Sequence, residues 1–280
     1  MKAIVSWAVS AAFGTILLGL TVSAATAQGL PPLPDAVRKA GVIRIGVKCD
    51  SPPFGASGPD GKPVGIEVEM AKKIGEFAFG SEKGAELSCV TSEARIPSLN
   101  GGKIDLILAT LGRFPAREEV IDFSNIYFWG TSNVLVPKDS AVKSLADLKD
   151  KSILIVKGGS QIKWMRENIP GISFVQLNTT ADSIQALLQG RADGFVGDGG
   201  LAYTLAANYP QLRVIEEGVD PGVNGVGLRK GEKELKAFVD AALDKLRADG
   251  FYQKAVPQFV TDAAVAKITL KGFVEPPPVK

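Results

Sequence analysis

The sequence has 280 residues, of which 45% are hydrophobic and 22% are charged, and a formal net charge of +2. A balance this close to neutral argues against nucleic acid and anionic membrane surfaces as partners. The chain has no histidine and only two cysteines, which excludes histidine-dependent catalytic triads and a structural zinc site, so we expect neither a metal nor a cofactor.

The first residues have the layout of a secretory signal peptide, residues 1–27. Met1-Lys2 precedes a nearly uncharged apolar run from Ala3 to Leu20, and the small residues that follow end at Ala27. This pattern predicts cleavage after Ala27 and export of the remaining chain. An uncleaved membrane anchor is the alternative, because about 18 apolar residues can just span a bilayer. Lys2 is the only charged residue in the segment, so cleavage changes the net charge from +2 to +1.

Short apolar strands then alternate with helical segments, which predicts an α/β fold with parallel sheets covered by helices. The expected strands are, in chain order, Val42–Cys49, Leu87–Thr91, Ile104–Thr110, Ser152–Lys157 and Ala192–Val196. The expected helices are Gly65–Phe77, Ile96–Asn100, Gln161–Asn168, Asp182–Gln189 with Thr179 or Thr180 as its cap, and an amphipathic helix from Leu235 to Leu246 that Gly250 ends. We interpret residues 263–280, which include three consecutive prolines, as a C-terminal tail.

An internal repeat indicates two similar lobes. Residues 99–110 align with residues 187–198 at a constant offset of 88, and each copy has a helix end, a glycine, a basic residue, an aspartate and a buried strand. Chance similarity between two helix-to-strand junctions is the alternative. If the repeat is real, Thr110 and Asp198 lie at equivalent carboxyl-terminal strand ends, where ligands bind in open α/β sheets. Two facing lobes then place them on opposite walls of one cleft.

Cys49 and Cys89 both lie on expected strands. An oxidising compartment allows them to form a disulfide. Two buried free thiols are an equally weighted alternative, because a bridge between adjacent parallel strands needs unusual geometry.

Several short motifs, in this order, resemble those of the polar amino acid-binding proteins of ABC importers, which are type II periplasmic solute-binding proteins of family 3. The motifs are Gly46–Phe54, Val64–Met70, Ala109-Thr110, Pro115–Arg117, Ile121–Ser124, Lys143–Leu148 and Gly190–Asp193. The similarity runs from about Gly41 to Phe259. It implies two Rossmann-like lobes joined by a two-segment hinge, with residues 41–129 and 226–262 in one lobe and residues 132–224 in the other.

The resemblance also implies a ligand site between the lobes. A free amino acid carries a carboxylate and an ammonium group, and burying either of them without a partner costs free energy. Arg117 matches the arginine that clamps the α-carboxylate in the family, Asp198 matches the aspartate that holds the α-ammonium, and Ser160 lies in a strand-to-helix turn that supplies further donors. A solvated arginine and a turn aspartate are the alternatives. The other implied ligand-binding residues are Phe54, Ala109, Thr110 and Gln161.

Lys48 and Arg95 match basic positions of the aspartate- and glutamate-binding branch. With Arg117 they give three cations against Asp198, which suits a ligand with two carboxylates and one ammonium, although exposed surface positions are the alternative for both residues. Three positions depart from the family pattern: Ile66 replaces an aromatic residue, Gly112 a hydroxyl-bearing residue and Ser51 a tyrosine. Arg113 either enters the cleft or faces water.

The implied function is that of a periplasmic binding protein, not an enzyme, which acts as a monomer and delivers an acidic amino acid to the permease of an ABC transporter in the inner membrane. The alternative is a periplasmic dehydratase-like enzyme on the same scaffold. Such an enzyme needs a cleft acid with a raised pKa, and Glu67, Glu93 and Asp50 are the candidates. A soluble partner of a separate membrane receptor is a third reading.

Overall fold

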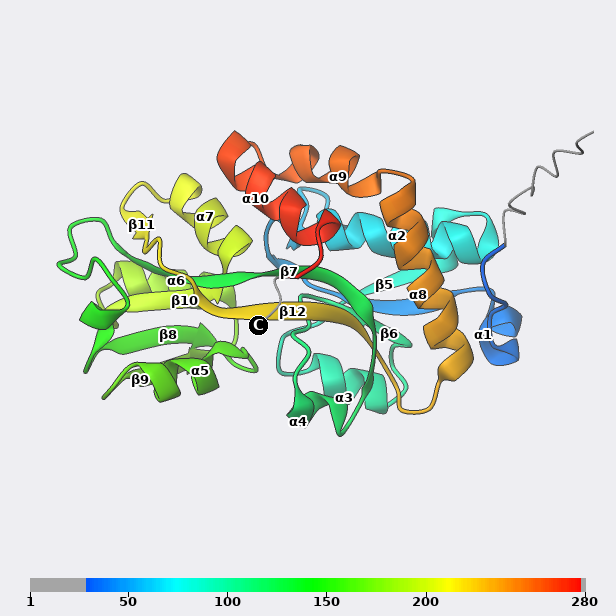
Figure 1. The fold of residues 1–280 in the computed structure, drawn as a ribbon, viewed down its shortest axis with the longest axis horizontal. Coiled ribbons are helices and arrows are strands. Elements are labelled where there is room, and N and C mark those ends of the chain that lie inside the picture. Colours follow the sequence, from blue (N-terminus) through cyan, green and yellow to red (C-terminus); the bar gives the residue numbers. More distant parts are fainter. Residues whose placement is uncertain (1–28, 278–280) are drawn as a thin grey trace, which may run out of the picture.

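The computed structural model describes residues 29–277 (Figure 1). The expected signal peptide and its cleavage site lie outside the described residues. Between residues 29 and 277, no helix combines the length and the apolar character that a membrane span requires.

Two lobes lie side by side and share one twisted sheet (Figure 1). Within the described residues this sheet has nine strands in the order β5-β1-β6-β12-β7-β10-β8-β9, with β11 beside β7. The strands are β1 Ile43–Val47, β5 Ala85–Cys89, β6 Leu106–Leu108, β7 Asp122–Pro137, β8 Ser152–Val156, β9 Ser173–Leu177, β10 Gly194–Asp198, β11 Leu212–Val214 and β12 Val219–Leu228. A small separate sheet contains β2 Asp50–Ser51, β3 Gly55–Ser57 and β4 Pro63–Val64.

Helices cover both faces of the shared sheet. They are α1 Asp35–Ala40, α2 Ile66–Phe79, α3 Arg95–Asn100, α4 Pro115–Glu118, α5 Gln161–Asn168, α6 Thr180–Leu188, α7 Gly199–Asn208, α8 Lys233–Ala248, α9 Phe251–Phe259 and α10 Ala263–Val274. Every strand and helix expected from the sequence is present, with ends that differ by no more than two residues. In α8 the apolar spacing is confirmed, because its buried residues are Leu235, Phe238, Val239, Ala242, Leu243 and Leu246.

Each lobe has its own apolar core. In the first lobe, β1 and β6 pack against α2, α8 and α9 on one face and against residues around α3 on the other. In the second lobe, β8 and β10 lie between α5 on one face and α6 and α7 on the other. Two cores that are packed separately allow the lobes to move as units.

The long strands β7 and β12 pass through both lobes as an antiparallel pair (Figure 1). Gly130 pairs with Gly222 where the chain crosses between lobes, and the register of the pair shifts between Asn224 and Gly225. Irregular pairing with small residues provides a place where the backbone can bend. The lobe boundaries expected from the sequence stay predictions.

The internal repeat is confirmed as a structural repeat. The Asp105 carboxylate accepts a hydrogen bond from the Arg44 amide at 3.0 Å, and the Asp193 carboxylate accepts one from the Ser152 amide at 2.9 Å. The amide of each aspartate in turn donates to the carbonyl of the same partner residue. Each aspartate therefore fixes the start of the neighbouring parallel strand in its lobe.

The interpretation of residues 263–274 as part of a tail is wrong. They form α10, whose first turn is capped by the Asp262 side chain accepting from the amides of Ala264 and Val265. Phe273 is 1% exposed and stacks on Tyr252 with ring centroids 4.6 Å apart. The prolines that suggested a tail begin only after this helix has ended.

Cys49 and Cys89 form a disulfide with a Cα–Cα distance of 5.6 Å. Cys89 ends β5 and pairs in register with Val47, whereas Cys49 lies beyond the end of β1. The bridge therefore joins adjacent parallel strands at a point where one of the two has left the sheet, which resolves the geometric objection to it.

Replacing both cysteines with serine should lower the free energy of unfolding by about 2–4 kcal/mol, because the bridge closes a long loop in the unfolded chain. The two residues are separated by 40 positions. Urea unfolding of the oxidised protein and of the double variant measures this difference. Adding a reductant should destabilise the parent protein and leave the variant unchanged; equal midpoints for both oxidised proteins would contradict the expectation.

Candidate functional site

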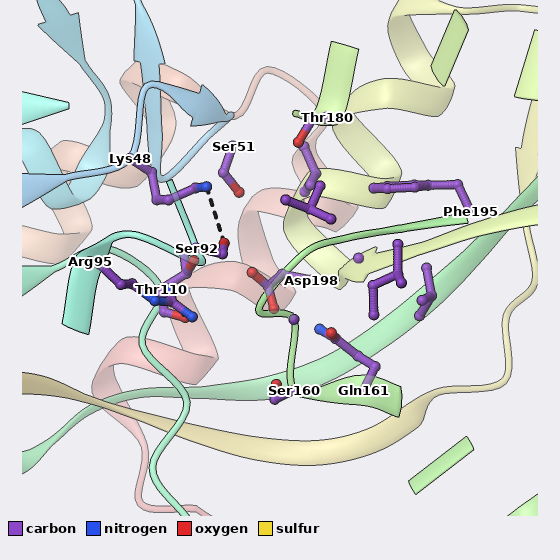
Figure 2. Close-up of a pocket in the computed structure, with 16 residues that line it drawn as sticks. Lys48, Ser51, Ser92, Arg95, Thr110, Ser160, Gln161, Thr180, Phe195 and Asp198 are labelled. Carbon is purple, nitrogen blue, oxygen red and sulfur yellow. Dashed lines mark hydrogen bonds between the residues drawn. The ribbon is translucent and has the colours of Figure 1, made fainter. Parts of the chain in front are cut away.

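A cavity lies between the lobes at the carboxyl ends of their strands (Figure 2). The first lobe contributes Lys48, Ser51, Ser92, Arg95 and Thr110. The second lobe contributes Ile155, Val156, Gly159, Ser160, Gln161, Thr180, Phe195, Val196, Gly197, Asp198 and Leu201. A smaller hollow shares Thr110, Ser160 and Asp198 with it and extends to the crossing strands. Polar and charged groups from both lobes therefore face one space.

Asp198 ends β10 and stands between the two walls of the cavity (Figure 2). The Thr110 hydroxyl lies close to its carboxylate, across the cleft. Burial raises the pKa of Asp198, while the charges of Arg95 and Lys48 and the Thr110 hydroxyl act in the opposite direction. The repeat thus brings its two equivalent strand ends into direct contact.

Arg95 begins α3 and is 3% exposed. Its guanidinium donates to the carbonyl of Ala109 and, at 3.3 Å, to that of Thr110. Its Nε has no hydrogen-bond partner among residues 29–277. A buried guanidinium with a donor to spare at a cavity wall is suited to an anionic group.

Lys48 lies on the same wall and is also 3% exposed. Its ammonium forms an ion pair with Asp50 at 2.6 Å and donates to the Ser92 hydroxyl at 3.2 Å (Figure 2). The charge count made from the sequence included Lys48 as a cation of the site but did not include Asp50, the carboxylate that pairs with it.

Arg117, in α4, lies at the border between the lobes. Its guanidinium donates to the Gly112 carbonyl at 2.8 Å and, across the cleft, to the Gly158 carbonyl at 2.9 Å. The guanidinium also stacks over the Phe114 ring, with its central carbon 4.5 Å from the ring centroid. Burial and the neighbouring Arg95 lower the pKa of Arg117, and Asp198 raises it. Arg117 is thus near Asp198, but it is not one of the residues that line the cavity.

The turn from β8 into α5 forms part of the second wall. Its Ser160 hydroxyl approaches Gly112, since a methyl group added at Gly112 would lie 3.4 Å from both that hydroxyl and the Arg117 guanidinium. Gln161 follows and donates to the Ser132 hydroxyl at 2.9 Å. The missing side chain at Gly112, a departure from the family pattern, thus lies where Arg117 and Ser160 meet.

Other expected positions lie away from the cavity lining. Phe54 is 1% exposed and packs in the core of the first lobe, where its ring centroid lies 5.1 Å from that of Phe128. The Ala109 carbonyl accepts a hydrogen bond from Arg95. Ile66 is buried at the start of α2. Arg113 is partly exposed and pairs with Glu118 at 2.5 Å. Ser51 does line the cavity.

Sequence reasoning missed several lining residues, namely Ser92, Thr180, Phe195 and Leu201. Ser92 follows the end of β5, so the rule that ligands bind at carboxyl-terminal strand ends was enough to find it. Thr180 was considered only as a helix cap, but Thr179 is the cap, since its hydroxyl accepts from the Asp182 amide. Nothing in the sequence around Phe195 and Leu201 distinguishes them from ordinary residues of the hydrophobic core.

Glu67 lies beneath this site and is fully buried. Both of its oxygens accept from the Thr110 amide, at 2.9 and 3.0 Å, and the Tyr127 hydroxyl donates to one of them. Burial raises the pKa of Glu67 to about 7, against the effect of these hydrogen bonds. The sequence had suggested Glu67 only as a candidate acid of an enzyme.

Known proteins are similar to this chain in sequence and in fold. Residues 43–262 match the bacterial extracellular solute-binding proteins, family 3. The chain is 30% identical to the ABC transporter glutamine-binding protein GlnH of Bacillus subtilis, over 94% of this chain and 98% of that protein. It is 33% identical to the glutamine-binding protein of Geobacillus stearothermophilus, over 71% and 77% of the two chains.

Solved structures give the same assignment. The crystal structure of the cysteine-binding protein of Campylobacter jejuni has a TM-score of 0.78 and 32% identity, and the match covers 84% of this chain and 96% of that one. The fold is therefore that of a type II periplasmic binding protein, as the sequence predicted. The matched region contains every charged residue of the cavity, so this protein belongs to the bacterial extracellular solute-binding proteins of family 3.

Proposed function

We propose that this protein is the periplasmic binding component of an ABC importer, which binds a polar, acidic amino acid between its lobes and delivers it to a permease in the inner membrane. The observation that carries the proposal is that Lys48 and Arg95 of one lobe and Asp198 of the other face a single cavity. Two relatives are named glutamine-binding proteins, which supports an amino acid as the ligand.

The ligand contacts follow from the charges around the cavity. Asp198 takes the α-ammonium group, helped by the Thr110 hydroxyl. Arg117 and the Ser160 turn take the α-carboxylate, with the guanidinium turning from the Gly158 carbonyl to the ligand. Gln161 holds the wall through Ser132, while Phe54 and Ala109 act indirectly, through packing and through the Arg95 contact.

The balance of charge supports an acidic side chain. Among the charged residues that line the cavity, Lys48 and Arg95 are positive and Asp198 is negative. The lining therefore has one positive charge in excess, while Asp50, the partner of Lys48, and Glu67, which lies beneath Thr110, are outside it. A zwitterion with an added carboxylate brings one negative charge and balances it, which makes glutamate or aspartate a better match than glutamine.

Binding closes the lobes around the crossing strands β7 and β12. A ligand that contacts both walls stabilises the closed form by its differential contacts, and the permease recognises that form. The rival enzyme is not favoured. Of its three candidate acids, Glu67 is sealed beneath Thr110, Glu93 is exposed, and Asp50 is paired with Lys48.

A thermal-shift screen of residues 28–280 against free amino acids tests the function. A ligand at a hundred times its dissociation constant should add about 2.7 kcal/mol of stability. We expect the largest shift with glutamate or aspartate. A larger shift with glutamine or a basic amino acid would contradict the acidic preference, and no shift with any amino acid would contradict the function.

The variant Lys48→Met sharpens this test. It should weaken glutamate binding by about tenfold or more and change glutamine binding much less, because it removes a cation that faces the side-chain carboxylate. The Lys62→Met variant is a matched control, since Lys62 is 81% exposed. Equal losses for both ligands in titration calorimetry would show that Lys48 does not contribute to side-chain selectivity.

A further inference from the structure

Thr110 has an unusual backbone conformation at the centre of the cavity. Its φ angle is 45°, in the left-handed region that β-branched residues avoid. Such a conformation persists only where the surroundings hold it in place. The Thr110 amide donates to Glu67, its carbonyl accepts from Arg95, and its hydroxyl lies close enough to Asp198 to lower the pKa of that carboxyl group.

Glu67 is well placed to hold this conformation. It lies in the first turn of α2, where its own amide donates to the Phe54 carbonyl at 3.0 Å. Its carboxylate contacts the Thr110 amide through both oxygens and accepts from Tyr127. Within residues 29–277, its hydrogen bonds are therefore to groups of the first lobe, and the one that reaches a residue of the cavity lining is to Thr110.

We propose that Glu67 is a positioning residue that couples ligand binding to pH: its ionised carboxylate holds Thr110 with the hydroxyl turned toward Asp198, and protonation of Glu67 weakens binding of the amino acid. This inference rests on the proposed function of the cavity. A protonated carboxyl group has lost one of its acceptor sites, because one oxygen then carries a hydrogen. The hydrogen bonds from the Thr110 amide and the Tyr127 hydroxyl are then weaker, because their acceptor no longer carries a negative charge.

Charged and titratable groups face Glu67 from several elements. Arg95 of α3 stabilises the ionised form, and Asp198 at the end of β10 opposes it. Tyr127 of β7 donates to it, and Tyr252 of α9 lies close enough for the Glu67 carboxylate to raise the pKa of the Tyr252 hydroxyl. Burial has the largest effect and raises the pKa of Glu67 to about 7, so protonation occurs near neutral pH.

The test compares glutamate binding by the parent protein and by Glu67→Gln between about pH 8 and pH 6. If only the ionised form is competent, the affinity of the parent falls about tenfold over this range. The glutamine side chain is close in shape to protonated Glu67. The variant should therefore bind weakly at pH 8, as the parent does at pH 6, and have a flatter pH profile. Burial also raises the pKa of Asp198, but Asp198 is present in both proteins, so the difference between the two profiles reports Glu67.

Thermal stability separates positioning from a merely structural role. Because the folded-state pKa of Glu67 lies above its ordinary value of 4.5, its contribution to stability is present at low pH and is lost as the pH rises through about 7. Glu67→Gln should therefore melt at pH 8 no lower than the parent, although it binds less tightly. A variant that loses stability and affinity together would overturn the proposal.

Tyr127→Phe provides a second readout that leaves Glu67 in place. Removing the hydroxyl that donates to the carboxylate should raise the pKa of Glu67 further and move the midpoint of the binding profile to higher pH. Unchanged affinity and an unchanged pH profile in both variants would overturn the coupling while leaving the proposed function intact. If the parent protein binds neither glutamate nor any other amino acid, the proposed function fails, and this inference fails with it.

Discussion

Replacing Asp198 with asparagine should lower the affinity for the amino acid by about a hundredfold or more, the effect of breaking a buried charge pair. The side chain keeps nearly the same shape but loses the negative charge that faces the α-ammonium. The cations Arg95 and Lys48, which now act on Asp198, would then face an added positive charge without compensation. Titration calorimetry at pH 8 with glutamate measures the loss.

Asp139→Asn is a suitable control, because Asp139 is exposed in the second lobe. It should bind as the parent does. The melting temperature of Asp198→Asn should stay close to that of the parent without ligand, since burial already disfavours the ionised form of Asp198. Wild-type affinity in Asp198→Asn would show that the ammonium group binds elsewhere, and would remove the observation on which the proposed function depends.

Sequence reasoning found the strand ends that build the site, because local patterns determine them. The glycine, aspartate and buried strand of the repeat predicted that Thr110 and Asp198 are equivalent. The reason appears only in the structure, where Asp105 and Asp193 each fix the start of a neighbouring strand. Similarly, α5 has the bounds Gln161–Asn168 that its sequence predicts.

Two segments that cross between the lobes were expected as a hinge, but the sequence did not predict that they form the long strands β7 and β12. β12 contains a proline and three glycines, which normally argue against a strand interior. β7 passes from one core to the other, so its burial pattern changes along its length and shows no regular alternation. The environment of a strand of this kind depends on both lobes, which a local pattern does not contain.

The sequence also did not predict which charged and polar groups pair with one another. Lys48 and Asp50 are two residues apart, and they form an ion pair because the chain bends between β1 and β2. Glu67 follows a buried isoleucine at the start of α2, and nothing in the local sequence reveals that Thr110 and Tyr127 satisfy it. Counting charged residues therefore identified the cations of the site and Asp198, but it did not assign Asp50 to Lys48 or Glu67 to Thr110 and Tyr127.

The variant Phe273→Ala should lower the free energy of unfolding by about 3–5 kcal/mol, the usual cost of truncating a buried phenylalanine. Phe273 stacks on Tyr252 and contacts Phe128 with ring centroids 4.7 Å apart. Phe128 precedes the crossing of β7 between the lobes, and its neighbour Trp129 donates from its indole to the Glu275 carbonyl at 2.8 Å. The helix α10 thus packs on the strand pair that joins the lobes.

In a protein of this size, a loss of that magnitude should lower the melting temperature by about 10 °C. Ile268→Ala, on the same helix, is the matched control because Ile268 is 65% exposed, and it should change the melting temperature little. A terminal tail makes no such contribution, so equal melting temperatures for the two variants would mean that α10 is not part of the folded core. Because Phe273 contacts the crossing strand and not the cavity, glutamate binding by the folded fraction of Phe273→Ala should stay within a few fold of the parent.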